Sequence, residues 1–153
     1  MVWFRPVFLA LMALVLVACQ TGGAQYRGVG ASGLGAGQMT QLRASAGLSA
    51  LAPDNRLEQA AIAQAAYMAG AGKMKHTTGW GRDFATRMRK AGVDAPAAEN
   101  LAHGRMEPQR LFAMWMASKG HRDNMLDPRF SRYGLAYAAD GTGRRYWALV
   151  LGR

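Results

Sequence analysis

The sole cysteine of this chain, Cys19, limits the ways in which the fold can be stabilised. A chain with one cysteine cannot form an intramolecular disulfide, so its stability must come from buried apolar surface. Hydrophobic residues make up 50% of the sequence, which is too large a share for a chain disordered by composition. Residues 19–153 are numerous enough to build one hydrophobic core, and no internal repeat is visible. We therefore expect one globular domain.

The residues that precede this cysteine have the pattern of a secretion signal. Residues 1–18 read MVWFRPVFLALMALVLVA, with one positive charge at Arg5 and then an apolar stretch that ends in a small residue. This stretch is too short to span a bilayer comfortably, which favours a signal peptide over a membrane helix. No second long apolar run follows it in the sequence.

The four residues Leu16-Val17-Ala18-Cys19 resemble a bacterial lipobox. In lipoproteins of that kind the cysteine thiol receives a diacylglycerol, and the leader is cut immediately before it. The alternative is an ordinary signal peptide with an incidental cysteine. Gln20 follows the cysteine, as in lipoproteins that Gram-negative bacteria sort to the outer membrane. We therefore expect a membrane-anchored lipoprotein of the cell envelope, on the periplasmic face of the outer membrane if the host is Gram-negative.

A glycine-rich segment separates the cysteine from the rest of the chain. Residues 21–37 read TGGAQYRGVGASGLGAG and show no apolar period. Such a segment predicts a flexible tether with an r.m.s. span of roughly 20–25 Å. The expected organisation is thus a signal peptide over 1–18, a lipidated cysteine and tether over 19–37, and a folded domain over 38–153.

The chain is strongly basic, with a formal net charge of +10 to which the leader adds only Arg5. A charge of this sign favours anionic partners, such as anionic lipid or a cell-wall polymer. No nucleic-acid-binding motif accompanies the charge, and secretion also argues against nucleic acid as a partner. The densest basic group is Arg82, Arg87, Arg89 and Lys90, which we interpret as a solvated helical face.

Apolar periodicity predicts a mixed α+β domain. Helices are expected over 39–48, from Asn55 to about Gly70, over 82–91 and over 108–118, with Asn55 and Glu58 as a capping box. The second of these helices is rich in alanine, which allows another element to pack closely against it. Residues 133–139 and 145–151 read as strands joined by a hairpin loop, and 97–102 is short and could be extended.

Three parts of the sequence with side chains suited to chemistry occur in a family-specific order. They are His76, the pair Glu99-Asn100, and the segment from Trp115 to Leu126 that contains His121. In order and spacing they resemble the bacterial branch of the CAP superfamily, named for cysteine-rich secretory proteins, antigen 5 and pathogenesis-related 1 proteins. The resemblance covers about residues 38–152, and it also includes Leu42, Arg43, Gly47, Arg87, Gly92, Gly104, Phe130, Gly134 and Tyr146-Trp147.

The resemblance implies a fold and a site. The implied fold is a CAP-type α-β-α sandwich, in which a small, mainly antiparallel sheet lies between helical layers. The implied site is a cleft lined by two histidines and two acids, matched here by His76, Glu99 and His121. Ser118 stands where the second acid is expected, and His103 matches no site residue, so we expect it on the surface.

Several chemistries fit these residues. Some members of the superfamily bind zinc or other divalent ions in this cleft, and His76, His121 and Glu99 could hold Zn²⁺ with one position open. With Ser118 in place of an acid, such binding is expected to be weak, and no cofactor is certain. The alternatives are a polar cluster that only shapes the cleft, and a Ser118–His121 nucleophile and base pair.

We expect a cell-envelope protein whose cleft binds a small ligand, lipid or divalent metal, without catalysis. The competing functions are a metal-dependent hydrolase acting on peptide or wall material through Glu99, and a structural protein with a vestigial cleft. We also expect structural roles for six residues: Trp115, Trp147, Phe130 and Leu126 in the core, with Asn100 and Asn124 bracing the segments that hold Glu99 and His121.

Overall fold

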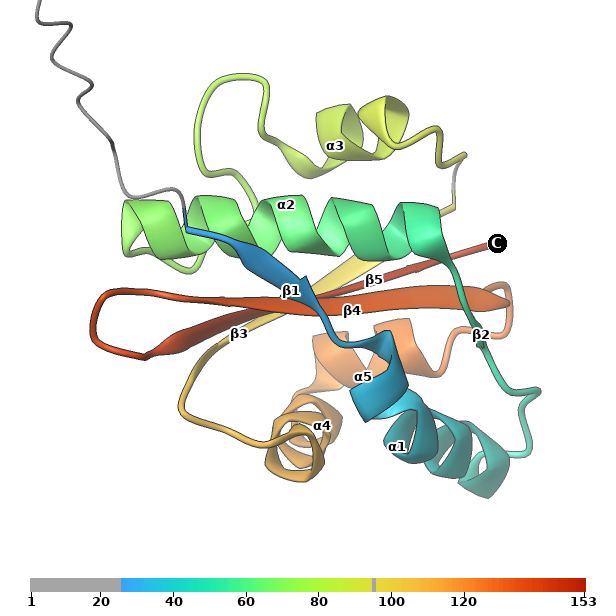
Figure 1. Cartoon of the computed structure of the whole chain (residues 1–153). Coiled ribbons are helices and arrows are strands. Elements are labelled where there is room, and N and C mark those ends of the chain that lie inside the picture. Colours follow the sequence, from blue (N-terminus) through green and yellow to red (C-terminus); the bar gives the residue numbers. More distant parts are fainter. Residues whose placement is uncertain (1–25, 95) are drawn as a thin grey trace, which may run out of the picture.

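The computed structural model describes residues 26–94 and 96–153, which form one sheet with helices on both of its faces (Figure 1). Among these residues the strand order is β1-β4-β5-β3, and β2 adds to β4. All pairings are antiparallel except that of β2 with β4, which is parallel. The strands are β1 (Gly28–Gly30), β2 (Ala52–Pro53), β3 (Ala98–Gly104), β4 (Arg132–Ala139) and β5 (Arg145–Gly152).

Two helical layers enclose this sheet, which confirms the α-β-α sandwich. The helices are α1 (Ser32–Ser45), α2 (Asn55–Ala71), α3 (Phe84–Lys90), α4 (Pro108–Ala117) and α5 (Lys119–Met125). Figure 1 shows α2 and α3 on one side of the sheet, and α1, α4 and α5 on the other. Each layer has its own apolar core, one centred on Trp115 and Trp147 and the other on Met68 and the alanines of α2. Across residues 26–94 and 96–153, no helix is both long and apolar enough to cross a bilayer.

Helix α2 lies unusually close to the sheet because small residues face each other across the contact. The buried face of α2 includes Ala60, Ala61 and Ala65, as the alanine-rich sequence predicts. Opposite it, a side-chain carbon at Gly134 of β4 would come within 2.1 Å of the Glu58 backbone nitrogen. Only glycine permits this approach.

The folded domain begins earlier than predicted, so the tether boundary at residue 37 is wrong. Residues 28–30 form β1, which pairs with β4, and α1 already starts at Ser32. The Ser32 hydroxyl accepts a hydrogen bond from the Leu135 N–H (3.0 Å), and the Ser32 carbonyl accepts one from Tyr133 (2.8 Å). The glycines mislead because they resemble a linker, whereas Gly28 and Gly35 are needed for close packing against Ile62 and Leu135. The predicted leader, Cys19 and the tether up to residue 25 lie outside the described residues.

The predicted capping box at the start of α2 is also wrong. Asp54 caps this helix, and its side chain accepts hydrogen bonds from the N–H groups of Arg56 (2.8 Å) and Leu57 (3.1 Å). Glu58 instead accepts a hydrogen bond from the Ser32 N–H at 3.0 Å, and so joins α2 to α1. The cap lies one residue earlier than predicted, because β2 pairs with β4 immediately before it.

The remaining expectations about elements hold with shifted edges. The segment that could be extended is β3, and the predicted hairpin is β4 and β5. Trp115, Trp147 and Phe130 are buried as predicted. Leu126 is only half-buried, because the chain places Met125 in the core in its stead.

Candidate functional site

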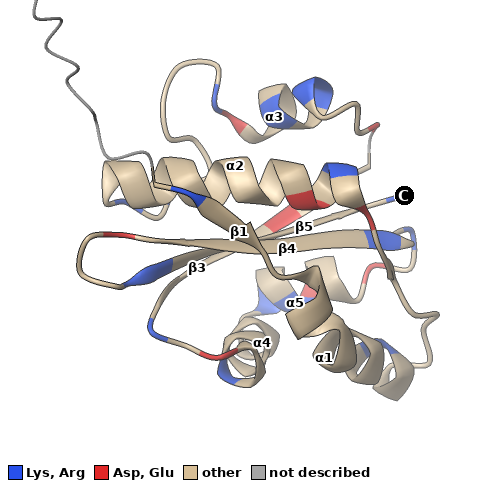
Figure 2. Cartoon of the chain, in the orientation of Figure 1, with Lys and Arg blue, Asp and Glu red and all other residues tan. Residues whose placement is uncertain are grey.

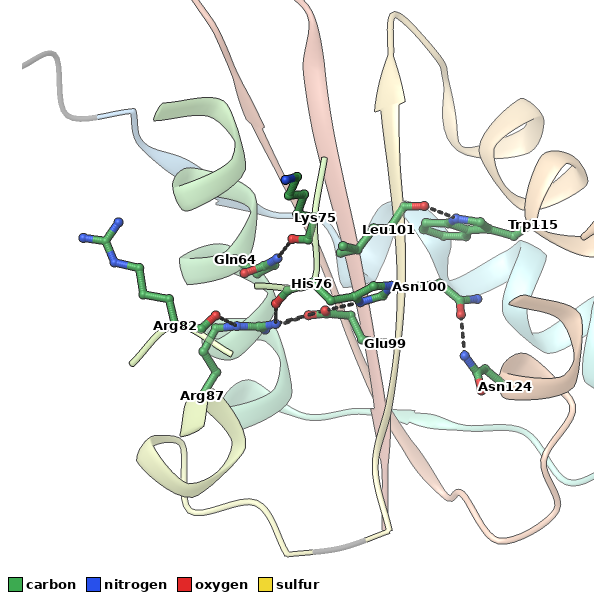
Figure 3. Close-up of polar contacts among 10 residues, drawn as sticks. All are labelled: Gln64, Lys75, His76, Arg82, Arg87, Glu99, Asn100, Leu101, Trp115 and Asn124. Carbon is green, nitrogen blue, oxygen red and sulfur yellow. Dashed lines mark hydrogen bonds and ion pairs between the residues drawn. The ribbon is translucent and has the colours of Figure 1, made fainter. Parts of the chain in front are cut away.

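The candidate site is built around β3, which is an edge strand of the sheet. Successive side chains of a strand point to opposite faces, so Glu99 and Asn100 project into different layers. Glu99 meets residues of the α2–α3 layer, and Asn100 meets α5. The site therefore has two halves, one on each side of β3 (Figure 3).

The first half is a buried ion pair between Glu99 and Arg87. Arg87 donates from Nη1 to Glu99 Oε2 at 2.6 Å and from Nη2 to Glu99 Oε1 at 2.9 Å. The two side chains are 2% and 4% exposed, so this bidentate contact is shielded from water. His76 Nδ1 also lies 2.8 Å from Glu99 Oε1. Both carboxylate oxygens are therefore engaged by protein groups.

The same arginine positions the segment that carries His76. Arg87 Nη2 donates to the His76 carbonyl at 3.0 Å, and Gln64 from α2 donates to the neighbouring Lys75 carbonyl at 2.6 Å. The His76 side chain itself is 58% exposed. His76 thus has a fixed backbone and one engaged ring nitrogen, while its ring faces solvent over much of its surface.

The second half of the site holds His121. Asn100 Nδ2 donates to the His121 carbonyl at 2.9 Å, and Asn124 Nδ2 donates to Asn100 Oδ1 at 2.9 Å. This agrees with the bracing roles predicted for the two asparagines. Burial is the larger of two causes that lower the pKa of His121, and the nearby His76 is the smaller one. The imidazole of His121 is therefore neutral at pH 7. Trp115 packs beside it with ring centroids 6.5 Å apart, and its indole donates to the Leu101 carbonyl at 3.0 Å.

Ser118 lies at the junction between α4 and α5 and does not pair with His121. Its extended backbone ends one helix and begins the next, and its carbonyl accepts from the Arg122 N–H. Within the described part of the chain, no hydrogen bond joins its hydroxyl to His121. The continuous helix that would align them is broken here. His103 is exposed, as predicted, and contacts Tyr146 edge-on.

The residues present do not form a complete metal site. No group of three His, Cys, Asp or Glu side chains within residues 26–94 and 96–153 converges so as to hold an ion. A zinc site takes three or four protein ligands, and here the Glu99 oxygens are committed to Arg87 and His76. The chemistry of this donor set leaves two imidazoles, His76 and His121.

Arg87 is the site residue that the sequence interpretation missed, because its basic neighbours suggested a solvated face. It shares the buried face of α3 with Met88, and of the three basic residues of that helix only Arg89 and Lys90 face solvent. The available signal was its spacing: Phe84, Arg87, Met88 and Ala91 follow a helical stripe. A charge within an otherwise apolar stripe indicates a buried partner of opposite sign.

Comparisons with known proteins identify the family and agree with this fold. The sequence profile of the cysteine-rich secretory protein family, CAP, matches residues 37–151. The chain therefore belongs to the CAP family. A curated relative, the uncharacterized protein YkwD of Bacillus subtilis, is 32% identical over 102 residues, which cover 65% of this chain and 39% of that protein. This chain thus matches about two fifths of the length of that relative.

Solved structures show the same fold at low sequence identity. An outer surface protein of Borrelia burgdorferi has a TM-score of 0.68 at 22% identity, over 76% of this chain and 87% of that one. An extracellular protein of Bacillus anthracis that contains an SCP domain has a TM-score of 0.66 at 22% identity, over 75% of this chain and 37% of that one. These likenesses establish the fold.

Proposed function

We propose that this protein is a cell-envelope lipoprotein whose CAP domain binds a small ligand at the edge of β3 and does not catalyse a reaction. The observation that carries the proposal is the state of Glu99. Its carboxylate is buried, Arg87 donates hydrogen bonds to both oxygens, and His76 contacts one of them. A general base needs an oxygen within hydrogen-bond reach of the substrate proton, and this carboxylate is already committed.

The ligand would meet two imidazoles of different character. His76 is largely exposed, and His121 is half-buried and neutral at pH 7. The imidazole ring is both a hydrogen-bonding group and a metal ligand. Two imidazoles without a third ligand favour weak, reversible contact with a divalent ion, or hydrogen bonding to a polar group of a lipid. We favour lipid over metal because the donor set falls short of a zinc site.

A test compares the protein purified from membranes with a variant carrying His76→Ala and His121→Ala. Mass spectrometry of extracted lipid should detect a species that copurifies with the parent and is lost from the variant. Zinc titration by calorimetry should show binding weaker than micromolar. Micromolar or tighter zinc binding that the variant loses would place a metal at these two histidines instead.

The competing hydrolase function has a separate test in Glu99→Gln, which keeps the shape of the side chain but removes its charge. If peptide or wall hydrolysis is detectable with the parent and disappears in this folded variant, the protein is an enzyme and our proposal is wrong. We expect no such activity in either protein. Circular dichroism of both proteins would establish that the variant is folded.

The envelope location rests on Cys19 and on relatives described as extracellular or outer surface proteins. Cys19→Ser should abolish incorporation of labelled fatty acid, because the thiol accepts the lipid. The leader of this variant should also stay uncut, so that the measured mass of the protein still includes the leader. Labelling equal to that of the parent would contradict lipidation at this residue.

A further inference from the structure

We propose that the segment between α2 and α3 is a second contact with the membrane, docking the domain onto an anionic lipid surface. We call residues 73–82 (KMKHTTGWGR) the basic loop. Its occupant in this proposal is the anionic headgroup layer of a bilayer. The expected closeness of this loop to the membrane rests on the lipid anchor proposed above, whereas the exposed tryptophan and the positive charge of the loop do not.

The basic loop exposes apolar side chains that a water-facing loop does not need. Trp80 is 100% exposed and Met74 is 45% exposed. The other tryptophans of the described residues, Trp115 and Trp147, are fully buried. Tryptophan is enriched at membrane interfaces, where its ring lies among headgroups with its N–H hydrated. Packing within the domain therefore does not explain why the Trp80 ring is fully exposed.

The charge around Trp80 matches an anionic surface. The basic loop carries Lys73, Lys75 and Arg82, and no acidic residue occurs anywhere from 59 to 82. The nearest acid in sequence, Asp83, caps α3 by accepting from the Thr86 N–H at 2.9 Å, and its negative charge offsets one of these three positive charges. Helix α3, which follows the basic loop, carries the exposed Arg89 and Lys90, and Figure 2 shows blue positions on this helix. Lysine and arginine near an anionic bilayer each contribute about 1 kcal/mol of attraction.

The fold places the basic loop beside the start of the described chain. Tyr26 and Arg27 line one hollow of about 560 Å³ together with Arg82 and residues of α2. Arg82 itself stacks over the Tyr67 ring, with its guanidinium carbon 4.4 Å from the ring centroid. Cys19 precedes Tyr26 by seven residues, a chain length that spans at most about 25 Å. A lipid at Cys19 would therefore hold this face of the domain, rather than the opposite one, near the membrane.

Docking in this orientation also has a consequence for the candidate site. His76 belongs to the basic loop, and it is the exposed member of the Glu99–Arg87–His76 cluster. A docked loop brings the open side of that cluster to the lipid surface. A lipid ligand could then reach His76 from the bilayer without crossing bulk water.

The test measures contact between Trp80 and lipid in the full-length protein expressed in a host that processes it. The protein is reconstituted with vesicles of phosphatidylcholine alone or mixed with phosphatidylglycerol, both carrying brominated acyl chains that quench tryptophan. The difference between parent and Trp80→Phe isolates the signal of Trp80. We expect strong quenching only with phosphatidylglycerol, and its loss at high salt.

Matched charge variants locate the contact. Replacing Lys73 and Lys75 with glutamine should lower the docking equilibrium about 25-fold, because each charge contributes about fivefold. Replacing Arg110 and Arg144 with glutamine removes the same charge from exposed positions elsewhere and should leave quenching unchanged. Equal effects of the two variants would overturn the proposal, as would equal quenching in the two kinds of vesicle.

Flotation and lipid analysis separate the docking surface from the anchor. Protein that floats with vesicles while Trp80 stays unquenched overturns docking and leaves the anchor standing. Quenching by anionic vesicles with no lipid on Cys19 supports docking and overturns the anchor. Failure to float with either kind of vesicle overturns both the docking surface and the anchor.

Sedimentation with purified peptidoglycan tests a wall polymer as the partner instead. If the protein sediments in a way that depends on Lys73 and Lys75, and vesicles do not quench Trp80, the basic loop binds a wall polymer and the lipid proposal is overturned.

Discussion

The buried pair of Arg87 and Glu99 should be the most sensitive polar contact in the domain. Replacing Arg87 with methionine keeps the aliphatic stem but removes the donors at 2.6 and 2.9 Å from Glu99 and at 3.0 Å from the His76 carbonyl. A carboxylate that is 2% exposed would then lose its charge partner. Breaking one side of a buried ion pair costs about 3–5 kcal/mol, and we expect a loss in that range at pH 7.

A second substitution identifies the cause of that loss. Adding Glu99→Leu removes the unpaired charge and should recover most of the stability at pH 7.

Urea denaturation of residues 26–153, followed by fluorescence of the buried tryptophans, measures these effects. Arg89→Met is the matched control. This exposed arginine of the same helix bonds Thr86 alone among the described residues and should change stability by less than about 0.5 kcal/mol. A loss for Arg87→Met below about 1 kcal/mol, or one that adding Glu99→Leu does not reduce, would refute the reasoning.

Three further predictions concern other parts of the molecule. Gly134→Ala should cost more than the 1–3 kcal/mol that is usual for overpacking, because the backbone of α2 blocks the new carbon. Gly33→Ala places its carbon in open space and should stabilise α1 by about 0.5–1 kcal/mol. Urea midpoints that rank the two variants in the opposite order would contradict the close helix–sheet contact. In an NMR titration, His121 should protonate below the ordinary histidine pKa of about 6.5, because its pKa is lowered in the folded protein. The stability that neutral His121 contributes is therefore complete above about pH 6.5 and is lost as pH falls through the folded pKa. Over that acidic range, a His121→Gln variant should lose less stability than the parent. Arg43 is 1% exposed and donates to the carbonyls of four residues, so Arg43→Met should cost several kcal/mol by leaving buried carbonyls unpaired, and a thermal midpoint equal to that of the parent would disprove this role.

The sequence was a sufficient guide to the elements whose signals are local. The apolar stripe of α2, the glycine after it and the hairpin of β4 and β5 depend on neighbours in the chain, and each was predicted with only small shifts. The choice between Asp54 and Asn55 as helix cap was not local. Both residues can cap a helix, and the pairing of β2 with β4 decided between them.

The glycines before residue 38 show the same limit. In sequence, a linker and a strand that packs closely against a helix are both rich in glycine. Gly28 belongs to the second class because Ile62 of α2 lies against it, a contact across more than thirty positions of sequence. Composition alone therefore placed the start of the domain too late.

For the candidate site, the sequence by itself determined which side chains are present, and the order of His76, Glu99 and His121 was enough to indicate the family. Only the tertiary structure decided what those groups do to one another. The alternation of β3 sends Glu99 and Asn100 into different layers, and the turn of α3 brings Arg87 against the carboxylate. The physical reason is that the protonation and availability of a carboxylate depend on burial and on charges a few ångströms away, and those neighbours come from elements that are distant in the chain.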